Sequence, residues 1–271
     1  MKEAKNIKLC KKLIARLEKK PYFSAAVKAY NNKYDWIVAD LISKGVTEEV
    51  ARTDSYKLIL SHLYDVMQEA KPIVEEVIVK RIENGEIKDK DQARKSVAGN
   101  LLQQFVAYSL AKNIIVKNIE KNVVVTLSAS ILNEYAVIKV GDDEQKPDSD
   151  VIVYSEEDKT SPIINFSCKT SCRERAGQTY KWKLLSDLAT CTCEHKTDNQ
   201  LCPITKYNLS YNPKRKVYMC FITTDFYNEL TNPQIAAMFN FFDNSYVAKT
   251  STSSTKIKSL ETVIDDINAY F

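Results

Sequence analysis

Glycine and proline are scarce in this chain, with 5 and 7 residues among 271. Linkers between domains are usually rich in glycine, serine or proline, and the sequence has no long segment of that composition. The hydrophobic fraction of 44% argues against disorder and is enough for a substantial core. Domain boundaries must therefore be inferred from the patterning of apolar residues.

Long apolar runs are also missing. No run approaches the roughly 18 residues that a membrane-spanning helix needs. The N-terminal segment MKEAKNIKLCKKLIARLEKK is charged and amphipathic, and it lacks the apolar core of a signal peptide. We therefore expect a cytoplasmic protein with no membrane partner.

Neither the charge balance nor the cysteine content assigns a function. Lys and Arg total 39 against 35 Asp and Glu, and the net charge of +4 neither demands nor excludes a polyanionic partner. Seven cysteines is an odd number in a chain without a secretory signal, which indicates reduced thiols in place of a disulfide framework. Local clusters of residues must decide the function.

The first third of the chain has helical periodicity. Apolar residues recur at helical spacing from Lys5 to about Asn113, and residues 1–90 are predicted to form an N-terminal all-helical domain. Pro72 suits the first turn of a helix that stops near Asn84, and a further helix is expected over residues 96–113.

The period changes after Asn113. Short runs rich in β-branched residues predict strands of one sheet: NVVVTLSAS, YAVIKV, DVIVY, IINFSCK and, later, VYMCFITTD. Helices are expected over residues 175–189, 232–242 and 257–271. This order predicts a mixed α/β (α+β) fold, with a central mixed sheet flanked by helices, in a second domain that spans residues 91–271.

Polar side chains with the chemistry of a phosphodiesterase lie at two predicted strand ends. Asp148 and Asp150 precede the run VIVY, and Lys169 closes the next run, after a turn short enough for a hairpin. A carboxylate can bind Mg²⁺, the backbone carbonyl of Cys168 can supply a second oxygen, and the lysine can stabilise charge on the phosphate. The alternative is a turn at PDSD with Lys169 as a solvated strand end.

This arrangement resembles the PD-(D/E)xK nuclease superfamily, in which an aspartate on one strand and an acidic-x-lysine on its neighbour form the active site. Asp150 is the favoured aspartate because it directly precedes the apolar run, whereas Asp148 keeps the literal Pro-Asp match. Ser167 stands where the acidic residue is expected. The resemblance implies a restriction-endonuclease-like core and a Mg²⁺ cofactor.

Lys169 is followed, after three intervening residues, by Arg173, Glu174 and Arg175. This K-x3-RER spacing resembles the recognition motif of CCGG-type restriction enzymes, including the BsaWI-like group. Arginine can donate twice to guanine and glutamate can accept from cytosine N4, so these residues at a helix start can read adjacent G·C pairs in the major groove. The alternative is a cluster of surface salt bridges, although neighbouring residues on a helix do not face each other.

The resemblance leaves the third carboxylate unassigned. In CCGG-type enzymes a glutamate some thirteen or fourteen residues beyond the lysine takes over, but Trp182 and Lys183 occupy those positions here. Asp187 and Glu174 are the candidates that remain. Gln103 stands where many restriction enzymes have a glutamate on the helix before the sheet, and it is either a neighbour of the active site or an amide on a helix surface.

A second candidate metal site is the segment CTCEHKTDNQLC. Its Cys191, Cys193, His195 and Cys202 are enough soft ligands for one zinc ion, but their spacing differs from the common CxxC pairs. A loop of reduced cysteines is the alternative.

The resemblance as a whole implies a type II restriction endonuclease that cuts double-stranded DNA at a C/G-containing palindrome. A palindrome presents the same half-site twice, so a homodimer is expected. The N-terminal helices then look like an accessory domain that grips DNA or joins subunits. Two alternatives stay open: a structure-specific repair or junction-resolving nuclease, and a DNA-binding protein without catalysis.

Overall fold

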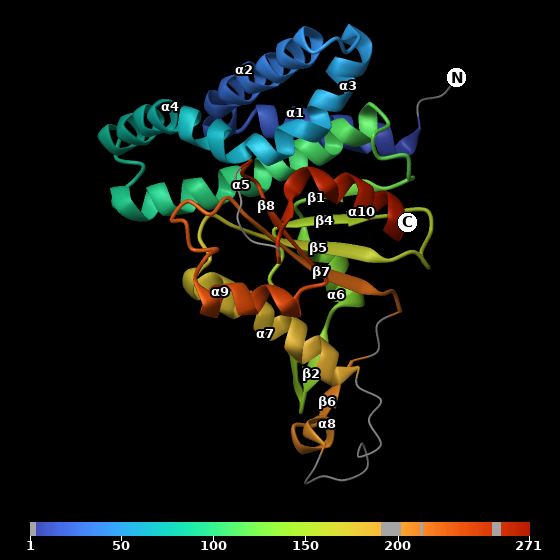
Figure 1. Ribbon diagram of the computed structural model, residues 1–271. Coiled ribbons are helices and arrows are strands. Elements are labelled where there is room, and N and C mark those ends of the chain that lie inside the picture. Colours follow the sequence, from blue (N-terminus) through green and yellow to red (C-terminus); the bar gives the residue numbers. More distant parts are fainter. Residues whose placement is uncertain (1–3, 191–201, 212–213, 251–255) are drawn as a thin grey trace.

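The computed structural model of the protein describes residues 4–190, 202–211, 214–250 and 256–271. Figure 1 shows a layer of long helices above a twisted sheet, with a smaller group of helices below it. A second, smaller sheet extends away from the main body at the lower end (Figure 1).

Five long helices form the upper layer, as the periodicity of the first third predicts. Their bounds are α1 Lys5–Glu18, α2 Pro21–Ser43, α3 Glu48–Leu58, α4 Leu63–Glu83 and α5 Lys90–Ile115, with a short 3-10 helix at Ile59–His62 between α3 and α4. Asp89 caps α5 by accepting a hydrogen bond from the backbone N–H of Gln92.

Pro72 does not begin a helix, contrary to the prediction. It lies inside α4, which starts nine residues earlier at Leu63 and ends near the expected position, at Glu83. An internal proline costs a helix about 3 kcal/mol. The buried stripe that includes Val66, Ala70 and Val74 continues through the proline and offsets that cost by packing.

The main sheet has six strands in the order β1-β4-β5-β7-β8-β9. Their bounds are β1 Val124–Thr126, β4 Val151–Tyr154, β5 Ile163–Lys169, β7 Val217–Thr223, β8 Asn244–Val247 and β9 Lys258–Ser259. The first three pair antiparallel and the rest pair parallel to β5 or to each other. The sheet is mixed, as the order of predicted elements indicates.

Both faces of the central strands are covered. On β7, Cys220 and Ile222 join the large core cluster beneath α1–α5, whereas Phe221 belongs to a second cluster on the other face. The lower face is covered by α7 Arg173–Ala189 and α9 Pro233–Met238, followed by a 3-10 turn at Phe239–Phe241 (Figure 1). Strand residues alternate between faces, so a strand buried on both sides is usually a nearly continuous apolar run, as β7 is.

The predicted strand YAVIKV does not belong to the main sheet. Its residues Ile138–Val140 form β2, which pairs antiparallel with β3 Asp143–Gln145 and β6 Leu209–Ser210 in a separate three-stranded sheet. Short helices α6 Leu132–Tyr135 and α8 Pro203–Lys206 flank this sheet in the chain.

The C-terminal helix is shorter than predicted. The segment begins with β9 and a 3-10 turn at Leu260–Thr262, and α10 spans only Val263–Tyr270. Leu260, Val263 and Ile264 join the large core cluster on the α5 side. Among the described residues, no helix combines the length and apolar character needed to cross a bilayer.

Candidate active site

The predicted site residues on β4 and β5 lie at one edge of the main sheet. β4 and β5 are antiparallel neighbours, so the residue before β4 meets the end of β5. The backbone N–H of Asp150 donates to the carbonyl of Phe166 at 3.1 Å, which extends the pairing beyond Val151. Asp150 and Lys169 therefore come to the same edge although 19 residues separate them.

Lys169 contacts both candidate aspartates. Its Nζ lies 2.8 Å from Asp148 Oδ2 and 2.8 Å from Asp150 Oδ2, so one ammonium group bridges the two carboxylates. The backbone N–H of Cys168 also donates to Asp150 Oδ2, at 2.8 Å. The lysine is therefore a bound strand end in a carboxylate pair, and the solvated alternative does not hold.

The exposure of the three side chains differs. The side chain of Lys169 is 8% exposed, Asp150 is 18% exposed and Asp148 is 54% exposed. Burial alone lowers the pKa of Lys169, but the charges of Asp150 and Asp148 outweigh it and leave this pKa raised. The ammonium group is therefore charged at neutral pH.

The donor set suits a hard divalent cation. Within the described part of the chain, the hydrogen bonds that the Asp150 carboxylate accepts fall on Oδ2, and Oδ1 has no donor there. Mg²⁺ is commonly held by one or two carboxylates together with water and phosphate oxygens. Burial strongly raises the pKa of the Cys168 thiol, so this residue offers its backbone oxygen and not a thiolate.

The polar face of β5 was not predicted. Asn165, Ser167 and Lys169 alternate along one face of the strand and are all buried. Asn165 Nδ2 donates to the carbonyl of Asp148 at 3.1 Å, and the hydroxyl groups of Ser167 and Thr179 on α7 are 3.2 Å apart. The signal in the sequence was a polar residue at every second position of a run that is buried on both sides.

The predicted recognition residues begin α7, and three residues separate this helix from Lys169. Arg173, Glu174 and Arg175 form its first turn. Their side chains lie outside the described part of the structure. The helical backbone fits the predicted presentation of these residues at a helix start, and their contacts with bases stay a prediction.

Two further candidates form their hydrogen bonds or ion pairs with other residues. Gln103 Nε2 donates to Asn100 Oδ1 on its own helix, at 2.8 Å, which matches the helix-surface alternative. Asp187 lies roughly 21 Å along α7 from Arg173. It pairs with Lys183, which also lies 3.6 Å from Asp243, the residue directly before β8.

Most of the candidate zinc ligands lie outside the residues that the structure describes. Cys191, Cys193 and His195 are not among the described residues, and Cys202 is buried against Ile204 and Leu209. Within the ranges that the structure describes, no group of three or more His, Cys, Asp or Glu side chains is arranged to hold a metal ion.

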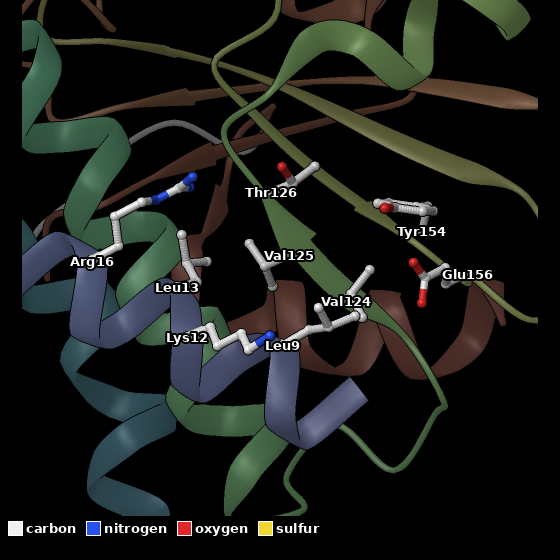
Figure 2. A pocket seen from close by; sticks show the side chains of 9 residues that line it. All are labelled: Leu9, Lys12, Leu13, Arg16, Val124, Val125, Thr126, Tyr154 and Glu156. Atoms are coloured by element: carbon white, nitrogen blue, oxygen red, sulfur yellow. The ribbon is translucent and has the colours of Figure 1, made fainter. Parts of the chain in front are cut away.

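A basic groove runs along the outer edge of the main sheet, between α1 and β1. Its volume is about 260 Å³, and Lys12, Arg16, Thr126 and Glu156 are among its lining residues. Figure 2 shows Arg16 and Glu156 at its two ends, with Lys12 between them. Thr126 pairs with Ile152, two residues from Asp150, so the groove extends toward the edge that carries the carboxylates.

The fold and the edge site define a class of protein. A mixed sheet flanked by helices, with an aspartate and a lysine meeting at adjacent strand ends, is a restriction-endonuclease-like α/β architecture. The comparison with protein families gives the particular family: a family model described as BsaWI restriction endonuclease type 2 matches residues 115–267.

The match covers more than half of the chain, and this protein therefore belongs to the BsaWI family of type 2 restriction endonucleases. Membership implies a nuclease that binds DNA and cuts it at specific sites. No curated protein sequence matches the chain. The matched range contains both candidate aspartates, Lys169 and the first turn of α7.

Proposed function

We propose that this protein is a Mg²⁺-dependent endonuclease that cleaves double-stranded DNA at a C/G-containing palindrome of the CCGG type. The observation that carries this proposal is the position of Lys169 Nζ between Asp148 and Asp150, three residues before the helix that begins with Arg173. Cutting and reading groups then share one junction between a strand and a helix.

Each residue at the sheet edge has a distinct role in this proposal. Mg²⁺, when bound, supplies the Lewis acid that polarises the phosphate and acidifies the attacking water. Asp150 would hold the cation together with the backbone oxygen of Cys168, and Asp148 would contribute from the more exposed side. Lys169 stays protonated between the carboxylates and stabilises the charge that develops on the scissile phosphate.

Base selection belongs to the start of α7. Arg173 and Arg175 donate to guanine edges and Glu174 accepts from cytosine N4, which is the pairing that planar donors and carboxylates favour in the major groove. A helix start is the part of a recognition helix that most often reaches the base edges. Glu174 cannot serve as the third carboxylate and read a base in the same complex, so we assign it to the base.

The assembly that fits a palindrome is a homodimer with two-fold symmetry. We assign residues 1–90 to an N-terminal helical region that contributes to duplex binding through the basic groove, and residues 91–271 to the catalytic and recognition region. We assign the protein to the cytoplasm, the location that the sequence predicts.

Digestion of a fully sequenced plasmid with Mg²⁺, followed by mapping of the fragment ends, tests the proposal. Wild type should give discrete bands whose ends share one C/G-rich palindrome, and Lys169→Ala should give no bands. Lys159→Ala is the matched control, because this exposed lysine lies in the hairpin at the opposite end of β4 and β5. It should cut like wild type.

Other outcomes would decide for the alternatives. Smears, or nicks confined to branched or damaged DNA, indicate a structure-specific nuclease. Binding without cleavage by wild type and by Lys169→Ala indicates a DNA-binding protein without catalysis.

A further inference from the structure

A second loop at the same sheet edge holds the link between Lys169 and the recognition helix. This link is only three residues long, Thr170 to Cys172. The loop after β7 lies against it: the backbone N–H of Phe226 donates to the carbonyl of Thr170 at 3.2 Å, and the hydroxyl group of Thr224 lies 3.5 Å from the same oxygen.

The other end of the link is held by a buried carboxylate. Glu229 is 7% exposed, and its Oε2 accepts a hydrogen bond of 2.7 Å from the backbone N–H of Cys172. Cys172 is itself fully buried and is the residue directly before Arg173. Its thiol lies 3.5 Å from Thr223 Oγ1 at the end of β7.

Glu229 is fixed within its own loop. Its backbone N–H donates to Asp225 Oδ1 at 2.6 Å, and the backbone N–H of Asp225 donates to Thr223 Oγ1 at 2.9 Å. Asp225 is 5% exposed and Thr223 is fully buried. The chain of bonds therefore runs from the end of β7, through two buried carboxylates, to the residue before the recognition helix.

Among the side chains that the structure describes, the N-cap residue of α7 provides no cap for this helix. Cys172 occupies the N-cap position and makes no side-chain capping hydrogen bond. A hydrogen bond from a backbone N–H to a carboxylate is short and directional, and a buried one has no competing water. The position of the first turn relative to Lys169 is then set by the loop after β7.

We propose that Glu229 is a positioning residue for sequence discrimination: it aligns the base-reading turn of α7 with the phosphate held at Lys169. This inference rests on the proposed function, because it needs α7 to read bases. Glu229 touches neither base nor phosphate in this scheme, and it acts through the backbone of Cys172.

The test compares cleavage of the cognate site with cleavage of sites changed at one base pair. Glu229→Ala removes the acceptor, and the ratio of the two rates should fall by about tenfold, the value of one good base contact. Glu229→Gln keeps an acceptor oxygen and should stay within about threefold of the wild-type ratio. Affinity for unrelated duplex DNA should stay within about twofold in both variants, because phosphate contacts carry no sequence information.

Two further variants separate positioning from general loss of stability. Glu229→Asp keeps the charge and shortens the side chain, and its ratio should lie between wild type and Glu229→Ala. Arg215→Met weakens the hairpin at the far end of the sheet. It should lower the melting temperature and leave the ratio unchanged.

The outcomes distinguish this inference from the proposed function. If wild type cuts at one site and Glu229→Ala keeps the wild-type ratio, the positioning role is wrong and the proposed function stands. If Arg215→Met lowers the ratio as much as Glu229→Ala does, discrimination follows stability and the inference is again wrong. If wild type shows no site preference, both are wrong.

Discussion

The two carboxylate side chains beside Lys169, those of Asp148 and Asp150, are not equivalent. Asp150 is mostly buried and accepts a backbone hydrogen bond from Cys168, whereas Asp148 is more than half exposed and its side chain contacts Lys169. A fixed, partly desolvated carboxylate is the better cation ligand, because its charge is less screened and its position costs no reordering. The geometry thus favours Asp150 as the principal ligand.

Asp150→Asn should therefore reduce the cleavage rate far more than Asp148→Asn. The loss of a ligand charge worth several kcal/mol corresponds to about 10³-fold for Asp150, and about tenfold is expected for Asp148. Single-turnover rates at saturating enzyme and a fixed Mg²⁺ concentration measure the difference. A larger loss for Asp148→Asn would make Asp148 the principal ligand.

A second residue whose role can be tested by substitution is Arg173, at the start of α7. Arg173→Ala should abolish cleavage at the cognate site, because a lost bidentate contact to guanine costs about 1 to 3 kcal/mol and misaligns the scissile phosphate. Its affinity for nonspecific duplex should fall only modestly. Gel-shift titrations with cognate and scrambled duplexes check both parts, and unchanged cognate cleavage would remove Arg173 from recognition.

At the scale of elements, the sequence predicts the parts of the fold with strong periodicity. β4, β5 and β7 were predicted because each is a continuous β-branched or apolar run, and the pairing of β4 with β5 follows from the short turn between them. These strands carry Asp150 and Lys169, so the centre of the candidate site could be predicted as well.

The missed elements are those that depend on distant partners. β8 has the sequence NSYV, which is too short and too polar to indicate a strand, and it becomes one by pairing with β7. The loop that contains Glu229 was missed for the same reason, since nothing in the sequence brings it to Cys172. Local patterns cannot predict contacts that only the parallel pairing of β5 and β7 creates.

Arg215 stabilises one element that the sequence did predict, the β4–β5 hairpin. Although almost fully buried, it donates to the carbonyls of Ser155, Ser161 and Pro162 in the hairpin turn. Arg215→Met keeps much of the volume but leaves these buried oxygens without donors. The free energy of unfolding should fall by about 3 kcal/mol, as measured by urea denaturation.

A small loss in that experiment would mean that water replaces the guanidinium group in the turn. Lys214→Met is the matched control, because it removes a cation at the preceding position, where the side chain is exposed. Its free energy of unfolding should change by less than about 0.5 kcal/mol.

At the scale of the whole molecule, the N-terminal helices and the sheet share one core. The large cluster includes Leu13 and Phe23 from the first helices together with Val153 and Phe166 from the sheet. The helical layer is thus packed against the strands that carry the candidate site, and α1 lies along β1. A basic surface at that position can add to DNA affinity without taking part in the chemistry.

The double variant Lys12→Ala, Arg16→Ala tests this contribution. Both side chains are exposed and line the groove beside β1. Glu156, which also lines the groove, forms an ion pair with Lys5. If each cation neutralises one phosphate, the slope of log affinity against log salt should become shallower by about 1.8. Affinity at about 0.1 M salt should fall roughly tenfold for cognate and scrambled duplexes alike. The single-turnover rate on saturated enzyme should not change, since neither residue touches the scissile phosphate.

Duplex length provides the sharper comparison. If α1 contacts the DNA that flanks the site, a short duplex that covers only the recognition site will not include this contact, and wild type and the double variant should bind it equally. A duplex extended on both flanks should bind wild type more tightly than the double variant. Lys139→Ala, an exposed position on β2 of the separate three-stranded sheet, should match wild type on both lengths. An unchanged salt slope on the extended duplex would exclude the groove as a phosphate-binding surface. Subunit contact would then remain as the proposed role of the helical layer, which shares its core with the nuclease sheet.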